Sequence, residues 1–226
     1  MIGAGRSDVA RAIFGVGQKR TGDVLLDGAP VTLKRPSDAV ELGIAFVPED
    51  RQAEGLVLGL NVARNVSLTQ LRRLAKAGFV DRRRELDLAD DQIKAMSIRA
   101  TSKSTVSELS GGNQQKVVLG KWLARGCRVL LLDEPTRGVD IGAKIEIYGL
   151  IRELAAQGAA VMLISSELPE ILHLADRIVV MSKGHIVWDR VNEAGGEADV
   201  AEEEQLVRAA LGLQASDAEG GDAHRN

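Results

Sequence analysis

Cysteine and aromatic residues are scarce in this sequence of 226 residues. The single cysteine, Cys127, excludes an internal disulfide and a multi-cysteine zinc site, and it favours a reducing compartment. We interpret Cys127 as a small, buried apolar residue. Aromatic residues make up only 3% of the chain, whereas 24 residues are glycine, which is typical of an α/β chain rich in Ala, Gly, Val and Leu.

Long apolar runs are also absent. The strongest runs, residues 129–132 and 159–164, have the length of buried strands and fall far short of a helix that crosses a bilayer. Residues 1–10 lack the cationic start, the apolar stretch and the small-residue cleavage site of a secretory signal. We therefore expect a protein that is not secreted and whose role at a membrane is, at most, peripheral.

The chain has no excess of positive charge. Its formal net charge is −3, and nucleic acids are bound by clustered basic faces. The basic run Arg82–Arg84 is flanked by Asp81 and Glu85, so we interpret it as a solvated helix face rather than a phosphate-binding patch. No nucleic-acid partner is expected.

Strand-length apolar segments alternate with helical segments in the second half of the chain. Helices are predicted from about Asn113 to Ala124 and from about Ala143 to Gln157, and buried strands at 128–132 and 159–165. Parallel strands need crossover connections of this kind. The pattern therefore predicts an α/β fold with a mostly parallel sheet, to which a buried strand at 44–48 is added.

Shorter elements are predicted around this alternation. They are a glycine loop before a helix at 8–14, a strand and turn at 22–28, a capped helical turn at 37–42, and a hairpin of 177–181 with 185–188.

A polar, arginine-rich and helix-favouring region separates the two α/β parts. It runs from Asn61 to about Met96, and it predicts a helical subdomain at about 58–112. We expect one domain at 1–212, followed at 213–226 by a disordered tail rich in Ala, Asp, Gly and Ser.

The most specific stretch is Leu-Ser-Gly-Gly-Asn-Gln-Gln-Lys at 109–116. Gly111 and Gly112 let backbone N–H groups approach an anion, the start of the following helix favours negative charge, and Ser110 can donate a hydroxyl hydrogen bond. The pattern indicates a site for a terminal phosphate.

A second chemical signal is Asp133-Glu134-Pro135, which follows the apolar run at 129–132. At the carboxyl end of a buried strand, Asp133 is placed to hold Mg²⁺ through a hard oxygen ligand. Glu134 is the candidate catalytic residue, since it can orient or deprotonate an attacking water. Taken alone, Asp-Glu-Pro is equally compatible with an acidic turn after a strand.

These two stretches, at this spacing, resemble the ABC ATPase family, whose signature loop and Walker B element they match. The resemblance implies the P-loop NTPase fold, with ATP and Mg²⁺ as cofactors. It further implies that Ser110, Gly111, Gly112 and Gln114 contact nucleotide from the signature loop. Asp140, in Thr-Arg-Gly-Val-Asp at 136–140, matches the D-loop, which crosses the interface between two nucleotide-binding domains.

The opening loop departs from the family pattern. A P-loop reads Gly, four residues, Gly-Lys-Ser/Thr, whereas here Gly3, Gly5, Arg6 and Ser7 occupy its end with arginine in place of lysine. A guanidinium is bulkier than an ammonium and holds its donors in a fixed fork, so we expect a degenerate site in which Ser7 remains the metal-contacting hydroxyl. Because the first P-loop glycine would precede Met1, we also expect a fold truncated at the N-terminus.

Two further departures concern residues assigned to nucleotide. Ser166 stands where most family members carry a histidine that contacts the γ-phosphate, and Glu49 lies near the position of the Q-loop glutamine. Together with Arg6, they favour an asymmetric arrangement in which this half completes a neighbouring site better than its own.

The combination resembles the monosaccharide importers of the ribose, galactose and xylose type, whose ATPase carries two nucleotide-binding domains in one polypeptide. The second half typically shows five motifs, all present here: Gly-Ala-Gly-Arg (3–6), Pro-Glu-Asp-Arg (48–51), the signature stretch (109–116), Asp-Glu-Pro-Thr-Arg-Gly-Val-Asp (133–140) and Ser-Ser-Glu (165–167). The resemblance implies an ATPase, weak or inactive as an isolated chain, at the cytoplasmic face of the membrane. Its partners would be another nucleotide-binding domain, a transmembrane permease and, indirectly, a periplasmic sugar-binding protein.

Two other interpretations remain open at this point. One is a non-catalytic fragment of a split or decayed transporter gene, which the position of Met1 inside the expected P-loop favours. The other is a soluble ABC ATPase without a transport role, for which inserted coiled coils or a basic linker would be expected; neither is visible.

Overall fold

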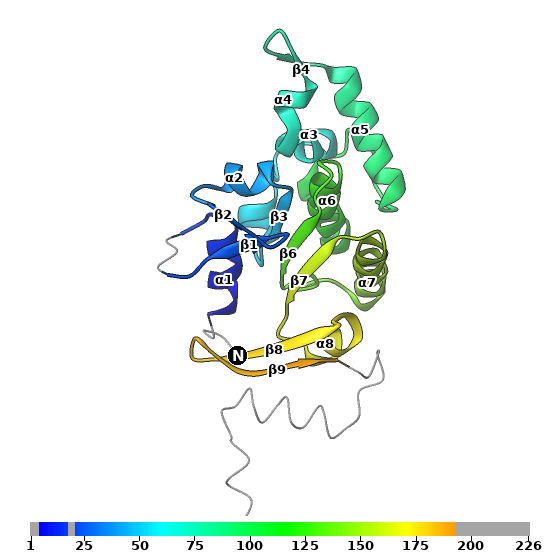
Figure 1. Ribbon diagram of the computed structural model, residues 1–226. Helices are drawn as coiled ribbons and strands as arrows, with labels where there is room; N and C mark the ends of the chain where they lie inside the picture. Colours follow the sequence, from blue (N-terminus) through cyan, green and yellow to red (C-terminus); the bar gives the residue numbers. More distant parts are fainter. Residues whose placement is uncertain (1–4, 18–20, 193–226) are drawn as a thin grey trace, which may run out of the picture. The chain divides into compact units, whose positions relative to one another are not determined.

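The computed structural model describes residues 5–17 and 21–192 (Figure 1). The chain divides into two compact units. The larger unit comprises Val9–Ile164, and the smaller unit comprises Met1–Asp8 and Ser165–Asn226. Helix α1 (Arg6–Ile13) runs across the boundary between them.

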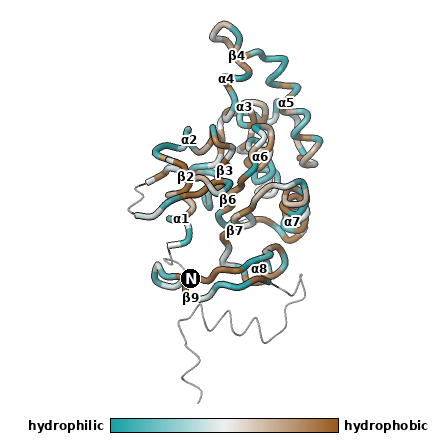
Figure 2. Tube along the Cα trace, viewed as in Figure 1, coloured by the Kyte–Doolittle hydropathy of each residue, from teal (hydrophilic) through white to brown (hydrophobic). Residues whose placement is uncertain are grey.

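The larger unit is built around a parallel sheet in the order β3-β6-β7, as the alternation of elements predicted. Its strands are β3 (Ile44–Val47), β6 (Val129–Asp133) and β7 (Ala160–Ile164). In the β3–β6 pair, Ile44 lies opposite Val129. In the β6–β7 pair, Asp133 lies opposite Ile164, so the carboxyl ends of β6 and β7 meet at one edge of the sheet. Figure 2 shows the apolar character of β6 and β7. The prediction of a buried strand is wrong for most of β7, since only Ile164 is buried and β7 is an end strand of the described sheet.

Two long helices flank this sheet. Helix α6 (Gly111–Leu123) contacts β3, helix α7 (Ile141–Ala156) contacts β7, and the two helices contact each other. Most of α6 is buried, including its polar residues Gln114, Gln115 and Lys116. Phe14, Phe46 and Trp122 form an aromatic cluster with ring centroids 5.4 and 5.7 Å apart, which joins the segment after α1 to β3 and α6.

The region predicted to be helical contains five helical segments and one unpredicted hairpin. The helical segments are α3 (Val62–Ser67), η2 (Leu68–Gln70), α4 (Leu71–Leu74), α5 (Arg82–Ala95) and η3 (Val106–Glu108). The hairpin pairs β4 (Ala75–Lys76) with β5 (Phe79–Val80) through a turn in which Ala77 and Gly78 both have positive φ. The arginines at 82–84 are exposed on α5, which is mostly hydrophilic (Figure 2).

The first part of the larger unit contains a short hairpin, a helical turn and a π-helix. Strands β1 (Val24–Leu26) and β2 (Ala29–Val31) are joined by Asp27-Gly28, both with positive φ, as in a two-residue hairpin turn. The predicted helical turn is α2 (Pro36–Glu41). A π-helix, η1 (Arg51–Gly55), follows β3 and was not predicted.

The smaller unit contains the predicted hairpin of β8 (Arg177–Ser182) with β9 (His185–Val191), joined by Lys183-Gly184. It also contains a helix that was not predicted, α8 (Leu168–Leu174), which packs on Ile178 through Leu172. The predicted tail at 213–226 lies outside the described residues. Within the described ranges, no helix is both long and apolar enough to span a bilayer.

Candidate nucleotide site

The start of helix α6 forms a turn suited to an anion, in which Ser110 is exposed, Gly111 is half-buried and Gly112 is buried. Ser110 is the N-cap, and its hydroxyl accepts hydrogen bonds from the Asn113 backbone N–H (3.4 Å) and from Asn113 Nδ2 (2.9 Å). The first N–H groups of a helix have no intrahelical acceptor, and the helix dipole makes this end positive. A terminal phosphate is the kind of group that such a turn binds.

Gly111 and Gly112 also have a packing reason to be glycine. A Cβ on Gly111 would lie 2.7 Å from Arg51 Nη2 and 2.9 Å from the Gly138 carbonyl oxygen, and a Cβ on Gly112 would lie 2.5 Å from Ala143 Cβ. The sequence had suggested only that glycine permits close approach of a phosphate. The structure adds that the turn is packed tightly against its own chain.

A second helix start lies beside the first. Asp140 is the N-cap of α7, and its Oδ1 accepts the Ala143 N–H at 2.9 Å. A cavity of about 250 Å³ is lined by Ser110, Gly112 and Asp140, among others. The structure therefore brings together three residues that the sequence assigned to nucleotide from two separate motifs.

Gln114 differs from these three residues. Its side chain is buried, its Nε2 donates to the Val106 carbonyl at 3.1 Å, and its Oε1 accepts from Gln52 Nε2 at 3.0 Å. These contacts anchor the first turn of α6. A direct contact of Gln114 with nucleotide stays a prediction.

The paired carboxylates lie at the carboxyl edge of the parallel sheet. Asp133 is the last residue of β6 and is 1% exposed. Glu134 follows with φ 47, and its N–H donates to the Ile164 carbonyl at 2.8 Å, which extends the β6–β7 pairing by one residue. A positive φ at a residue other than glycine costs about 1–3 kcal/mol and persists where the surrounding structure imposes it, which is common at functional sites.

Asp133 and Glu134 place two neighbouring acidic residues at this edge. The described ranges contain no group of three or more His, Cys, Asp or Glu side chains arranged to hold a metal. Mg²⁺ is commonly held by one or two carboxylates together with phosphate oxygens and water. A buried carboxylate on Asp133 is compatible with that arrangement.

Glu49 follows β3 and is partly exposed. Its carboxylate forms an ion pair with Arg137 of the 136–140 loop. The position that resembles the Q-loop is thus joined to the segment that resembles the D-loop.

The opening loop and Ser166 belong to the smaller unit. Gly5 has φ +81, and α1 begins at Arg6, with Ser7 in its first turn. Arg6 Nη1 donates to the Ser165 carbonyl at 2.8 Å, next to the exposed Ser166. Gly3 lies outside the described residues.

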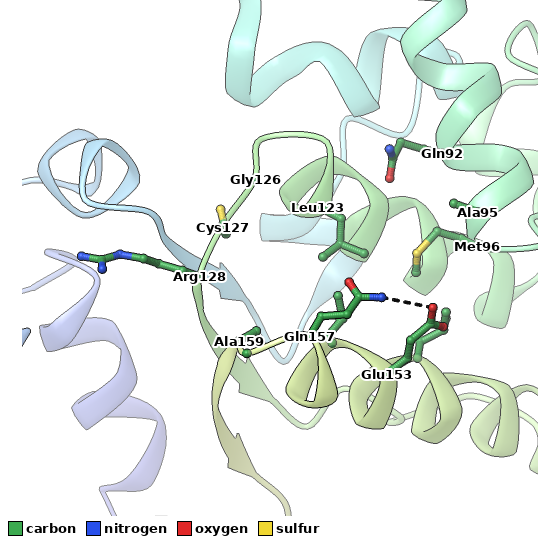
Figure 3. A pocket seen from close by; sticks show the side chains of 13 residues that line it. Gln92, Ala95, Met96, Leu123, Gly126, Cys127, Arg128, Glu153, Gln157 and Ala159 are labelled. Atoms are coloured by element: carbon green, nitrogen blue, oxygen red, sulfur yellow. Dashed lines mark hydrogen bonds between the residues drawn. The ribbon is translucent and has the colours of Figure 1, made fainter. Parts of the chain in front are cut away.

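A larger cavity, of about 400 Å³, lies away from these motifs (Figure 3). It is lined by the C-terminal ends of α5, α6 and α7 and by residues that precede β6 and β7, so it opens at the edge of the sheet opposite Asp133 and Glu134. Figure 3 shows the hydrogen bond from Gln157 Nε2 to Glu153 Oε1, 3.2 Å long, beside it. Cys127, interpreted from the sequence as a buried residue, is only partly buried. It lines this cavity, and desolvation raises the pKa of its thiol to about 11.

Two residues near the signature turn, Ser110–Gly112 at the start of α6, were not assigned a role from the sequence. Lys116 has a side chain 4% exposed, and it forms an ion pair of 2.5 Å with Glu146 of α7, whose pKa is lowered by the hydrogen bond from Lys116 and by its charge. Arg51 donates to backbone carbonyls of the 136–140 loop. Both residues lie within quoted motifs, but their partners are distant in the sequence.

The fold and site define an ATP-binding cassette with the α/β P-loop NTPase fold. Residues 2–137 match the ABC transporter family, and the chain belongs to that family. Solved ATP-binding cassettes of ABC transporters have the same fold. A nucleotide-free cassette superposes with a TM-score of 0.73 at 20% identity, covering 92% of this chain and 81% of the cassette. A cassette in its ADP conformation gives 0.74 at 21% identity, covering 93% and 85%.

Within the family, the chain is similar to ribose import ATP-binding proteins. It is 48% identical over 213 residues to the protein of Geobacillus kaustophilus, covering 94% of this chain and 42% of the relative. It is 46% identical over 215 residues to a protein of Agrobacterium fabrum, covering 94% and 41%. The chain therefore spans about two fifths of the length of these relatives.

Proposed function

We propose that the chain is the second nucleotide-binding domain of an ABC importer for monosaccharides and that it supplies its signature turn to ATP bound mainly by a partner domain. The similarity to ribose import ATP-binding proteins supports the substrate class. The five motifs that resemble the second half of such proteins support the position in the polypeptide.

The observation that carries this proposal is the serine-capped start of α6, which lines a cavity together with the start of α7. In the proposed sandwich, Ser110 and the N–H groups of Gly111 and Gly112 face the terminal phosphate of ATP held by the partner. Asp140 lies at the contact between the two domains. The start of α6 would direct its positive dipole end to the phosphate, whereas the Asp140 carboxylate offsets the dipole of α7.

The chain's own site is proposed to be slow or structural. Asp133 would hold Mg²⁺, and Glu134 would orient the attacking water. Arg6 stands in for the usual lysine and already donates to the Ser165 carbonyl. A planar guanidinium held in this way is a poor replacement for a mobile ammonium. The isolated chain is therefore expected to hydrolyse ATP slowly or not at all.

The partners follow from the proposed role. Closing of the two nucleotide-binding domains on ATP would bias a transmembrane permease between its inward and outward states, because ATP binds the closed form better. The chain would act at the cytoplasmic face of the membrane, with a periplasmic sugar-binding protein delivering the substrate. The segment after Glu49, residues 56–60, is a candidate permease contact.

A charge added at the signature turn tests the proposal. Aspartate is as good an N-cap as serine, so Ser110→Asp keeps the cap of α6 while it places a carboxylate against the proposed phosphate. We expect the ATP turnover of the complex with the partner domain and permease to fall by about 100-fold, as on loss of one phosphate-stabilising donor, while the melting temperature stays close to that of the wild type. A Gly111→Asp substitution is less informative, because any side chain there meets Arg51 and Gly138.

The matched control is Asn61→Asp. Asn61 is the N-cap of α3, its Oδ1 accepts the Arg64 N–H at 2.9 Å, and the substitution adds the same charge to a helix start away from the site. Turnover should stay within about twofold of wild type, the range of minor surface effects. Equal turnover of Ser110→Asp and Asn61→Asp would contradict the proposed role of the signature turn.

A further inference from the structure

We infer that Arg51 is a positioning residue that holds the signature turn at a set distance from the 136–140 loop. The inference rests on the proposed function, since it is the placement of this turn on the partner's ATP that Arg51 would control. Arg51 itself does not touch the nucleotide in this account.

The guanidinium of Arg51 bridges two backbone segments. Its Nη1 donates to the Arg137 carbonyl at 2.6 Å, and its Nη2 donates to the Gly138 carbonyl at 3.3 Å. The fixed fork of a guanidinium can satisfy two adjacent carbonyls at once, which the single ammonium of lysine does less well. The 136–140 loop is thereby tied to the segment after β3.

The same group packs on the signature turn. A Cβ on Gly111 would lie 2.7 Å from Arg51 Nη2 and 3.7 Å from Arg51 Cζ. The guanidinium group therefore lies close to the first residue of α6. One side chain contacts both elements that the proposed sandwich requires.

The backbone of Arg51 is itself anchored at both ends of η1. The Asp50 carboxylate accepts the N–H groups of Gln52 and Ala53, both at 3.0 Å. At the other end, Lys121 Nζ of α6 donates to the Gly55 carbonyl at 2.6 Å. Because η1 is fixed to α6, Arg51 helps to set where the 136–140 loop lies relative to the start of α6, together with the direct contact of Gly138 with Gly111.

A second tie runs parallel to the first, since Glu49 pairs with Arg137. The segment Glu49–Arg51 thus binds the 136–140 loop through one ion pair and two hydrogen bonds. Loss of Arg51 leaves the ion pair in place, so we expect the signature turn to be misplaced rather than the chain to unfold.

The first experiment uses the isolated full chain and does not depend on the proposed function. Amide hydrogen exchange at residues 111–114 and 138–140 should be faster in Arg51→Ala than in wild type, with Arg51→Lys in between. The matched control is Arg128→Lys, which alters an exposed pair with Asp27. Unchanged exchange at 111–114 in Arg51→Ala would overturn the inference.

The second experiment measures MgATP turnover in the complex with the partner domain and permease. A misplacement of about 1 Å near reacting groups can cost about 100-fold in rate, so we expect kcat to fall between about tenfold and 100-fold in Arg51→Ala and less in Arg51→Lys. KM for ATP should change by less than about twofold, because in this account most contacts to ATP come from the partner. Arg128→Lys should match wild type in both constants.

The two experiments distinguish a failure of the proposed function from a failure of the inference about Arg51. A wild-type complex without turnover would contradict the proposed function, while the exchange experiment would still decide whether Arg51 holds the turn. A working wild-type complex in which Arg51→Ala keeps its kcat would overturn the inference alone. Equal changes in kcat for Arg51→Ala and Arg51→Lys, without partial rescue by lysine, would also overturn it.

Discussion

Glu134 combines a proposed catalytic carboxylate with a backbone conformation that only glycine adopts freely. Its φ is 47, and its N–H donates to the Ile164 carbonyl where the chain leaves β6. The sequence Asp-Glu-Pro indicates the carboxylates, but it does not indicate this conformation.

Glu134→Gly and Glu134→Ala separate the two properties. Both variants lose the carboxylate, so both should lose ATP turnover in the complex. Glycine relieves the left-handed conformation, and we expect Glu134→Gly to be more stable to urea than Glu134→Ala by about 1 kcal/mol. Equal stability of the two variants would mean that the backbone is not strained there.

Lys121 makes the stability of the chain depend on pH. Its ammonium is buried, donates to the Gly55 carbonyl at 2.6 Å, and lies 5.4 Å from the centroid of the Trp122 ring. Burial lowers the pKa of Lys121 from 10.5 to about 8. Between these pH values the unfolded chain binds more protons at Lys121 than the folded chain, so the free energy of unfolding rises with pH across this window.

The Lys121→Met variant keeps the apolar stem and removes the titration. We expect the stability of wild type relative to Lys121→Met to increase from pH 8 to pH 10.5 by at most about 3 kcal/mol, at about 1.4 kcal/mol for each pH unit. Urea unfolding of both proteins at several pH values measures this. A constant difference, or one that decreases with pH, would contradict the burial of the charge.

Cys127 should react slowly with thiol reagents. The thiolate is the reactive form, and a pKa of about 11 leaves very little thiolate at neutral pH. We expect alkylation of the folded chain by iodoacetamide to be at least about tenfold slower than that of the chain in denaturant, because an ordinary cysteine titrates near 8.5. Equal rates would show that the thiol is not shielded.

At the scale of helices and strands, the close approach of α6 to α7 is testable through glycine. A methyl group on Gly112 would lie 2.5 Å from Ala143 Cβ, and we expect Gly112→Ala to destabilise the fold by about 1–3 kcal/mol. Gly149 is the matched control, since it lies in α7 with nothing within 4 Å of an added Cβ. Gly149→Ala should stabilise the fold by about 0.5–1 kcal/mol. Thermal melting of both variants checks the difference in sign.

The main elements could be predicted from apolar patterns, and the small ones could not. Strands β3, β6 and β7 follow from short apolar runs, although β7 is buried only at Ile164. The β4–β5 hairpin has only two residues in each strand, too few to show an alternation. Helix α8 is seven residues long. Leu168, Ile171 and Leu172 have helical spacing, but one such set in so short a segment is a weak signal.

The candidate site was predictable where its chemistry is local. The signature turn and the paired carboxylates are contiguous in the sequence, and turn and strand rules place them. The role of Arg51 depends on contacts with residues 86 and 87 positions away, and no local pattern reports such a contact. The packing reason for Gly111 was missed for the same reason.

At the scale of the whole molecule, the chain is an ATP-binding cassette of the ABC transporter family that spans about two fifths of its ribose import relatives. A cassette sandwiches nucleotide with a second cassette in the proposed function, so its activity is a property of an assembly. In the proposed function, one face of the nucleotide site is formed by the turn at Ser110–Gly112 and the loop that ends at Asp140. Contacts within the larger unit hold both segments in place.

The most direct test of the central proposal locates the terminal phosphate on the chain. The assembled complex is trapped with MgADP and orthovanadate, which occupies the position of that phosphate, and is irradiated with ultraviolet light to cleave the backbone beside bound vanadate. The account predicts cleavage of this chain at residues 110–112, dependent on the partner domain. Cleavage elsewhere in this chain with residues 110–112 intact, or the same cleavage without the partner, would contradict it.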